Sequence, residues 1–172
     1  MLNISYGDYA PDIVNAVIEI SSNGKPVKYE INKYNGLLYV DRFISTSMRY
    51  PCNYGYIPDT LCEDGDSLDI LVLSPFSLIN GCIIEVRPIG ILNMIDEKGV
   101  DCKILSVPVD KLTTLYSNIK NYNDLNDCFL KKIEHFFNHY KDLEKNKWVK
   151  IDIWEDAKKA KEKIVKCMNK FI

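Results

Sequence analysis

The sequence predicts an α+β protein in which a small closed OB-like β-barrel of about five strands is flanked by C-terminal helices. The first two-thirds of the 172-residue chain contain short apolar or alternating runs bounded by turn residues. The last third contains apolar residues at helical spacing. No linker or internal repeat divides the sequence, so residues 1–172 are expected to form a single domain. Periodicity alone leaves open whether the strands close into a barrel or form an open sheet.

The strands are predicted at residues 14–20, 27–31, 37–43, 69–73, 82–94 and 101–107. In the second of these, Lys28 and Glu30 fall on the same face, as the two-residue period of a strand requires. The loop at residues 97–100 joins the last two strands. It would bring Asp96 and Asp101 close together at the mouth of a hairpin.

Two helices are predicted in the last third. In the first, Leu125, Phe129, Ile133 and Tyr140 recur at helical spacing, and Asp124 is the expected N-cap. The second helix is expected at roughly residues 155–170. It would bury a set of residues that recur at the same period: Ala157, Ala160, Ile164, Cys167 and Phe171.

The composition is that of an ordinary globular chain, with 47% hydrophobic and 27% charged residues. No apolar stretch approaches the ~18 residues needed to span a bilayer. Residues 1–8 lack the features of a signal peptide, so we expect no membrane association and a cytoplasmic location. The six cysteines include no CxxC pair, which favours reduced, mostly buried thiols over a disulfide framework. The acidic balance of residues 1–140 argues against nucleic-acid binding, which usually needs a strongly basic face.

Residues 63–70 form the densest acidic segment, just before an apolar strand. Its acids are Glu63, Asp64, Asp66 and Asp69, around a glycine at position 65. Carboxylates this close repel one another unless a cation lies among them, and oxygen ligands suit Mg²⁺ or Ca²⁺. Leu68 and Pro75 exclude an EF-hand that begins at Asp64. His135 and His139 lack the Glu of HExxH, so two exposed or packed histidines are favoured over a zinc pair.

Other polar residues at strand ends and turns complement this acidic segment. Asp96 and Asp101 form a second acidic group, and Lys103 lies on the same face of its strand as Asp101. Further basic or phenolic residues are Lys28, Arg42, Tyr140 and Lys141. Each alone has an ordinary structural explanation, as a turn, a solvated face or a helix end. Together they indicate a polyanion held between bridging metal ions and basic side chains, as in metal-assisted phosphoryl transfer.

Ordered blocks of sequence at family-like spacing carry a more specific resemblance. They are residues 17–20, 28–31, 40–43, 50–56, 64–69, 96–108 and 135–144. Over nearly its whole length, the chain resembles the soluble family I inorganic pyrophosphatases, especially the bacterial ones. One position departs, because Ser67 stands where the family usually has Pro or Glu. That change bears on the rigidity of the loop rather than on the reaction.

The resemblance implies hydrolysis of inorganic pyrophosphate to two phosphates by a water that several Mg²⁺ ions activate. It implies that Asp66 is the general base and that Glu19 is an acid behind the metal ligands. The metal ligands would be Asp64, Asp69, Asp96, Asp101 and Glu30. The phosphates would be held by Lys28, Arg42, Tyr54, Lys103, Tyr140 and Lys141. A homohexamer is also implied, with His135 and His139 near a subunit contact, and Glu63 is expected to be only a solvated neighbour.

Three alternatives stay open at this point. An OB-type nucleic-acid-binding module without catalysis could use Tyr34, Tyr39, Tyr54 and Tyr56 as stacking platforms, although the carboxylates would oppose a nucleic-acid backbone. A metal-dependent phosphohydrolase could act on a different phosphorylated substrate. A catalytically inactive family member used only for binding is disfavoured, because the polar set is intact.

Overall fold

A computed structural model describes residues 4–32 and 34–171, so residues 1–3, 33 and 172 lie outside the described chain. Within it, one sheet contains β1 (Val14–Ile20), β4 (Asn53–Tyr56), β5 (Asp69–Val72), β6 (Ile83–Asp96), β7 (Gly99–Pro108) and β8 (Val149–Asp156). A separate hairpin contains β2 (Val27–Ile31) and β3 (Leu38–Phe43). The helices are the short η1 (Tyr122–Asp124), α1 (Asp127–His139) and α2 (Ala157–Phe171).

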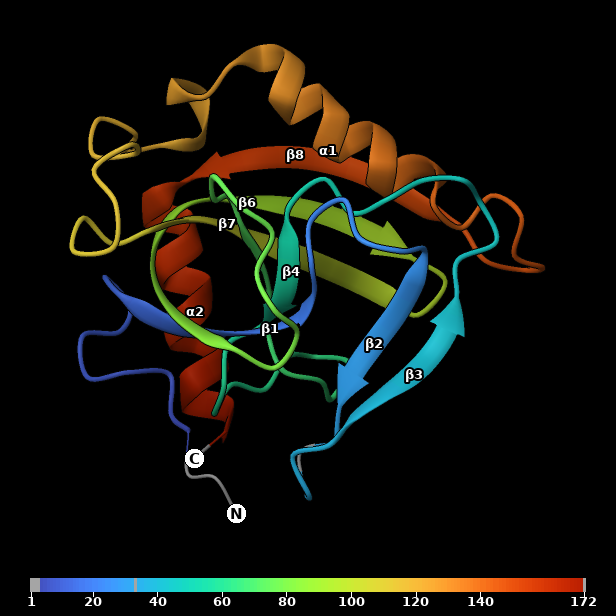
Figure 1. Ribbon diagram of the computed structural model, residues 1–172, viewed down its shortest axis with the longest axis horizontal. Coiled ribbons are helices and arrows are strands. Elements are labelled where there is room, and N and C mark those ends of the chain that lie inside the picture. The colour runs from blue at the N-terminus through green and yellow to red at the C-terminus, as the bar shows by residue number, and fades with distance from the viewer. Residues whose placement is uncertain (1–3, 33, 172) are drawn as a thin grey trace.

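The main sheet closes on itself. β1 pairs with both β4 and β6, which completes a ring in the order β1-β4-β5-β7-β6. Neighbours in the ring are antiparallel except β5 and β7, which run parallel. β6 is long enough to pair with β1 near its start and with β8 over residues 90–96. The ring is visible in Figure 1, with the β2–β3 hairpin beside it. The prediction of an α+β fold with a closed OB-like barrel is confirmed.

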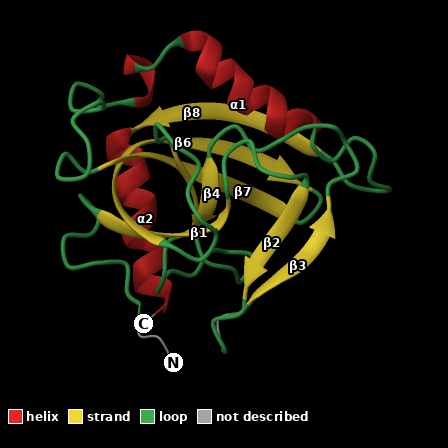
Figure 2. Ribbon diagram, in the orientation of Figure 1, coloured by secondary structure: helices red, strands yellow, loops and turns green. Residues whose placement is uncertain are grey.

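Two apolar layers form on the two faces of the barrel wall, because side chains alternate along each strand. Ile70 and Ile104 pack in one layer with residues of α2. Leu71 and Leu105, their neighbours in sequence, pack in the other layer with residues of α1. Figure 2 shows the two helices on different sides of the strands. Each fully buried side chain of this kind contributes about 1.5–3 kcal/mol, so both helices are anchored to the barrel.

Two strands of the sheet were not predicted from the sequence. In β4, Gly55 interrupts the apolar pattern, and a Cβ there would lie 1.8 Å from the backbone oxygen of Val17. Only glycine therefore allows β1 and β4 to approach this closely. β8 pairs with β6 outside the closed ring, and half of its side chains are exposed, so no continuous apolar run marks it.

The predicted N-cap of the first helix is wrong. α1 begins after Asn126, whose side chain accepts a hydrogen bond from the backbone N–H of Cys128 at 2.8 Å. Asp124 instead accepts hydrogen bonds from the N–H groups of Lys120 and Asn121, at 2.8 and 2.9 Å, and so closes η1.

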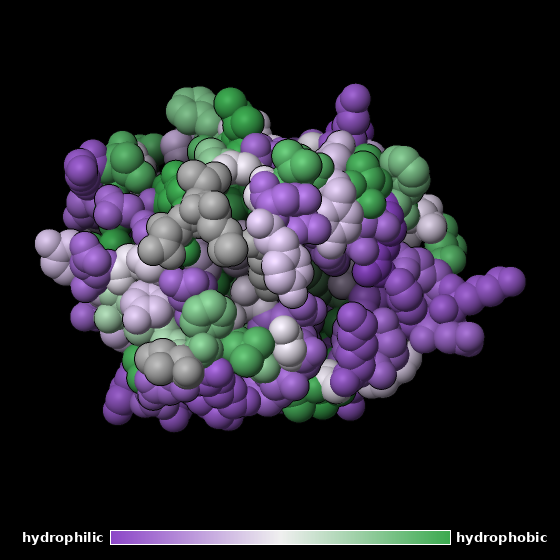
Figure 3. All heavy atoms as spheres, turned by 90° about the horizontal axis from the view of Figure 1, so that it is seen from below, coloured by the Kyte–Doolittle hydropathy of each residue, from purple (hydrophilic) through white to green (hydrophobic). Residues whose placement is uncertain are grey.

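The space-filling view from below shows hydrophilic side chains over much of the surface, with hydrophobic ones scattered among them (Figure 3). None of the described helices combines the length and the apolar character needed to cross a membrane.

Candidate active site

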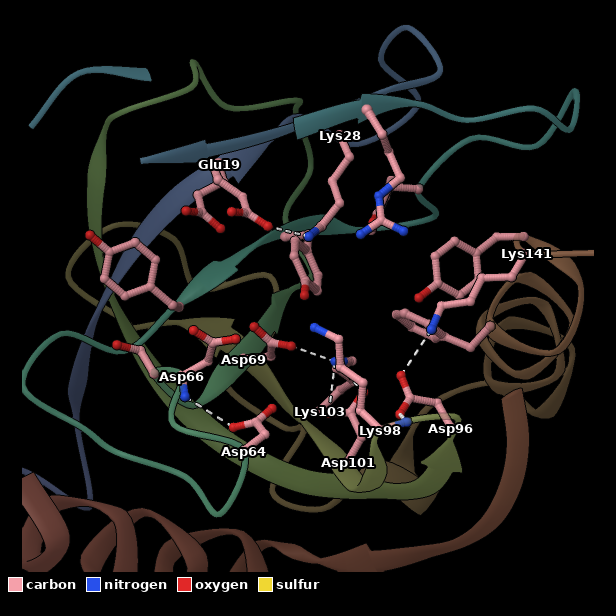
Figure 4. A pocket seen from close by; sticks show the side chains of 18 of the residues that line it. Glu19, Lys28, Asp64, Asp66, Asp69, Asp96, Lys98, Asp101, Lys103 and Lys141 are labelled. Carbon is pink, nitrogen blue, oxygen red and sulfur yellow. Dashed lines mark hydrogen bonds and ion pairs between the residues drawn. The ribbon is translucent and has the colours of Figure 1, made fainter. Parts of the chain in front are cut away.

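One pocket of about 380 Å³ is lined by every site residue that the sequence predicts. They come from β1, β4, the β2–β3 hairpin, the turn before β5, the first residue of β5, the β6–β7 hairpin and the two residues after α1. They are Glu19, Lys28, Glu30, Arg42, Tyr54, Asp64, Asp66, Asp69, Asp96, Asp101, Lys103, Tyr140 and Lys141. Figure 4 shows Lys28 pointing from the hairpin toward the aspartates on the opposite side. The fold thus brings together residues that lie between positions 19 and 141 of the sequence.

The β2–β3 hairpin presents two basic side chains, Lys28 and Arg42, and the carboxylate of Glu30 to the pocket. Across its two strands, Lys28 pairs with Arg42 and Glu30 pairs with Tyr39. Arg42 and Tyr39 are three residues apart, so they share a face only because the register shifts by one residue between these pairs. Lys28 forms an ion pair with Glu30, and the Tyr39 hydroxyl donates to Glu30 Oε2 at 2.6 Å. Sequence reasoning missed this role for Tyr39.

The turn at residues 62–66 carries Asp64 and Asp66 on its exposed side. Gly65 has φ +87°, a left-handed conformation that glycine adopts readily. The Asp64 side chain accepts a hydrogen bond from the Asp66 N–H at 3.1 Å, and the Cys62 N–H donates to the Asp66 carbonyl at 2.7 Å. The turn is therefore ordered while both carboxylates face solvent in the pocket.

Glu63 is exposed and does not line the pocket, as expected, but it also takes part in an ion-pair cluster. It pairs with Lys163 and Lys166 at 2.9 Å and with Lys170 at 3.1 Å, all three from α2. These ion pairs were not predicted, because α2 is distant in sequence and its approach to the turn leaves no local pattern.

Lys103 lies at the centre of the pocket and is only 5% exposed. Its Nζ atom lies 2.7 Å from Asp101 Oδ2 and also forms an ion pair with Asp69. Burial by itself lowers the pKa of Lys103, but Asp69 and Asp101 outweigh that effect and raise the pKa well above its ordinary value. Two carboxylates from different strands thus share one buried ammonium group (Figure 4).

Lys141, just after α1, joins the helix end to the β6–β7 hairpin. Its Nζ atom lies 2.8 Å from Asp96 Oδ2 and 3.1 Å from Glu97 Oε2. Burial raises the pKa of Asp96, whereas the hydrogen bond and charge of Lys141 lower it, and the net shift is downward. Glu97 was not among the predicted site residues. Its position directly after Asp96 in a hairpin loop was the available signal.

Glu19 of β1 is a buried acid at the back of the pocket, 8% exposed. Its Oε1 atom accepts a hydrogen bond from the Ile31 N–H at 2.8 Å. Burial raises the pKa of Glu19 to about 7, the Ile31 bond lowers it in part, and the negative charge of Asp69 raises it further. A divalent cation nearby would favour the ionised form of this group.

Aromatic rings line the wall next to these charges. The Tyr54 ring centroid lies 5.8 Å from Lys103 Nζ, and Tyr140 stacks on Phe136 with centroids 5.1 Å apart. Burial raises the pKa of both tyrosines above its ordinary value. Their hydroxyl groups are therefore neutral hydrogen-bond donors at neutral pH.

The donor set is chemically suited to Mg²⁺, since the predicted ligands all offer hard carboxylate oxygens. In the part of the chain that is described, no three His, Cys, Asp or Glu side chains lie close enough together to hold an ion. Instead of metal ions, the ammonium groups of Lys103 and Lys141 neutralise several of these carboxylates. Binding of Mg²⁺ would require these ammonium groups to exchange partners, and an anionic substrate offers them new ones.

Comparison with known proteins identifies the class of protein to which this site belongs: the diphosphatases, a class of hydrolases. The inorganic pyrophosphatase of Escherichia coli strain K12 is 52% identical over 165 residues, which cover 96% of this chain and 94% of that protein. A solved structure of an inorganic pyrophosphatase from Coxiella burnetii is 48% identical, with a TM-score of 0.95, covering 98% of this chain and 100% of that chain. A structure of an inorganic phosphatase from Anaplasma phagocytophilum is 51% identical, with a TM-score of 0.97 and coverage of 98% and 99%.

The inorganic pyrophosphatase family pattern matches residues 16–172 of this chain. The chain therefore belongs to the inorganic pyrophosphatase family, and the resemblance inferred from its sequence blocks is confirmed. The alternative of a nucleic-acid-binding module finds no support in these comparisons.

Proposed function

We propose that this protein hydrolyses inorganic pyrophosphate to two orthophosphates with the help of Mg²⁺. One observation carries the proposal: a single pocket holds five aspartates and also Lys28, Arg42, Lys103 and Lys141. Carboxylates alone would repel an anionic substrate, and cations alone would not bind metal ions. A pocket with both suits a polyanion that arrives together with divalent ions.

Asp64, Asp69, Asp96, Asp101 and Glu30 would hold the Mg²⁺ ions. When bound, Mg²⁺ neutralises phosphate charge and lowers the pKa of a coordinated water. In this mechanism Asp66, exposed at the tip of the turn, accepts the proton of the attacking water as general base. Glu19 lies behind the ligands and adds negative charge that favours cations in the pocket.

The basic and phenolic side chains would bind the two phosphoryl groups. Lys28 and Arg42 approach from the hairpin, and Lys103 and Lys141 approach from the barrel side and the end of α1. Positive charge stabilises the leaving phosphate as its negative charge grows. The hydroxyl groups of Tyr54 and Tyr140 donate hydrogen bonds without adding charge.

The test is phosphate release from pyrophosphate by the purified protein with Mg²⁺, with ATP as the control substrate. We expect rapid release from pyrophosphate, little from ATP, and none after chelation of the metal. Equal release from both substrates would favour a phosphohydrolase of another specificity. Ca²⁺ should inhibit, because its longer bonds and looser geometry hold the attacking water less well.

We further propose that the protein is a homohexamer that works in the cytoplasm. Phe43, Phe76 and Ile79 are 74%, 77% and 82% exposed in the single chain, which supports burial of some surface between copies. His139 pairs with Asp142 at 2.8 Å on the exposed end of α1. The six free cysteines suit a reducing compartment. Light scattering with and without Mg²⁺ would measure the assembly size, and a monomer at all concentrations would contradict the proposal.

A further inference from the structure

Cys62 and Cys167 are far apart in the sequence but in contact in the structure. Their Sγ atoms lie 3.3 Å apart, and 105 positions separate them along the chain. Cys62 belongs to the turn before β5, Cys167 belongs to α2, and both are free thiols. A disulfide bond needs a sulfur separation of about 2.05 Å, so an approach of about 1.2 Å would close the bond.

Other contacts hold the turn against α2 and keep these thiols together. The Leu61 N–H donates a hydrogen bond to the Cys167 carbonyl at 2.9 Å. Glu63, on the other side of Cys62, forms the ion pairs with the three α2 lysines described above. Cys62 is therefore flanked by two attachments to the same helix. The packing of the turn against α2 therefore holds the two thiols in contact.

We infer that Cys62 and Cys167 form a thiol-oxidation site that a low-molecular-weight disulfide converts to an intramolecular disulfide. The new bond would join α2 covalently to the turn that carries Asp64 and Asp66. The consequence for Mg²⁺ binding rests on the proposed function, whereas the oxidation itself does not.

The accessibility of the two sulfurs sets the order of the reaction. Cys62 is partly exposed, whereas Cys167 has no exposed surface, so the oxidant reaches Cys62 first. The hydrogen bond to Cys167 and burial raise the pKa of the Cys62 thiol, so this first step is the slow one. Cys62 loses its proton and attacks one sulfur of the oxidant, whose other half leaves as a thiolate. Cys167 then attacks the Cys62 sulfur of this mixed disulfide and releases the second half. Two protein thiols are oxidised, the oxidant is reduced to two thiols, and the two protons pass to the leaving groups.

The surroundings of Cys167 favour this second step. The hydrogen bond from Cys62 lowers the pKa of Cys167, and the positive charges of Lys163 and Lys170 act in the same direction against its burial. A thiolate is the attacking form in disulfide exchange. Cys102 of β7 belongs to the same apolar layer and is the nearby competitor that an experiment must separate.

Closing the bond should disturb the acidic turn. The Cys62 N–H donates to the Asp66 carbonyl, and Asp64 lies two residues further along the chain. A displacement of Cys62 toward α2 therefore pulls on the backbone that positions both carboxylates. We expect the Mg²⁺ concentration that gives half-maximal thermal stabilisation to change at least threefold on oxidation.

The site is tested by treating the full chain with oxidised glutathione and mapping disulfide-linked peptides by mass spectrometry. We expect a Cys62–Cys167 link that dithiothreitol reverses and that both Cys62→Ser and Cys167→Ser abolish. The matched control is Cys128→Ser, which removes an exposed thiol on α1 and should leave the link intact. A Cys62–Cys102 link, or a mixed disulfide with glutathione that persists on Cys62, would contradict the proposal that Cys62 and Cys167 form the oxidation site.

The effect on the turn is tested by Mg²⁺ titration of thermal stability in the reduced and oxidised protein, a readout independent of turnover. Wild type should show the threefold change and Cys167→Ser should show none. A Cys62–Cys167 link with an unchanged Mg²⁺ midpoint would overturn the effect on the turn. A chain with no Mg²⁺ response in either state would contradict the proposed function and that effect together, while a mapped link would still support the thiol site.

Discussion

Lys103, which is buried, and Asp69, which is partly exposed, form an ion pair between two parallel strands of the barrel. Ile70 of β5 is in register with Ile104 of β7, so the residues that precede them lie side by side. Asp101, two residues before Lys103, points to the same ammonium group at 2.7 Å. The parallel pairing of β5 and β7 therefore places one cation between two carboxylates, and neither strand would do so alone.

We predict that Lys103→Met destabilises the metal-free protein by about 3 kcal/mol. The substitution keeps the apolar stem of the side chain but leaves Asp69 and Asp101 facing each other without a cation. Urea unfolding in the presence of a chelator measures the free energy of unfolding. Added Mg²⁺ should recover part of the loss, because a metal ion can take the place of the ammonium between the carboxylates.

Lys131→Met is the control for this substitution. Lys131 pairs with Asp127 at 2.6 Å on α1, but the two side chains are 70% and 76% exposed. An exposed pair of this kind contributes little, so the control should lose little stability. Equal losses in the two variants would show that burial of the Lys103 charge is unimportant.

Much of this site could be predicted because its residues lie in local patterns. The acids before β5 form a dense cluster in the sequence, and strand periodicity places Asp101 and Lys103 on one face. The contacts made by Tyr39 and Glu63 could not be predicted in the same way. Tyr39 reaches Glu30 only through a register shift in the hairpin, and Glu63 meets lysines of a distant helix.

The limits of the fold prediction have a similar origin. β8 lies outside the closed ring with half of its side chains exposed, so its sequence lacks the apolar run that marked the inner strands. Gly55 marks a close crossing of two backbones, a requirement that a local propensity does not express. The contact between Cys62 and Cys167 likewise follows only from the closed barrel and the position of α2.

We predict that Tyr39→Phe raises the Mg²⁺ concentration required for half-maximal activity by about fivefold. The hydroxyl holds Glu30 Oε2 at 2.6 Å, and its loss removes a hydrogen bond of roughly 1 kcal/mol from a proposed metal ligand. The hydrogen bond to Glu30 raises the pKa of Tyr39 to about 12, so the phenol is a donor at neutral pH. Turnover at saturating Mg²⁺ should change less than twofold.

Tyr34→Phe is the matched control, since Tyr34 lines the same pocket with 89% of its surface exposed. Its Mg²⁺ requirement should equal that of wild type. A drop in turnover at saturating Mg²⁺ for Tyr39→Phe, with no change in the Mg²⁺ requirement, would contradict a role through Glu30.

We predict that Glu19 makes the metal-free protein less stable as the pH rises from 4.5 to 7. The folded state raises the pKa of Glu19 from 4.5 to about 7, so it binds the proton more tightly than the unfolded chain does. The resulting stabilisation is complete below pH 4.5 and is lost as the pH passes through about 7. It amounts to ~3 kcal/mol at most.

Urea unfolding of wild type and Glu19→Gln in the presence of a chelator, across this pH range, measures the effect. The difference in unfolding free energy between the two proteins should shift in favour of the variant as the pH rises. A difference that stays constant with pH would show that the carboxyl of Glu19 is not buried as described.

We predict that Asp66→Asn lowers turnover by a factor of about 10²–10⁴ at saturating Mg²⁺, as expected when a general base is lost. The amide keeps the size of the side chain, and the turn depends on the Asp66 backbone rather than on its carboxylate, so the fold should persist. Phosphate release and Mg²⁺-dependent thermal stabilisation, measured side by side, separate catalysis from metal binding.

Asp64→Asn provides the contrast, because the two carboxylates lie two residues apart in the same exposed turn. Loss of a proposed metal ligand should weaken Mg²⁺ binding, and excess Mg²⁺ should restore much of the activity. Asp66→Asn should show the opposite pattern, with nearly normal Mg²⁺ binding and a turnover that excess Mg²⁺ does not restore. If Mg²⁺ rescues Asp66→Asn and not Asp64→Asn, the two roles must be exchanged, and the proton would then be accepted at the first aspartate of the turn.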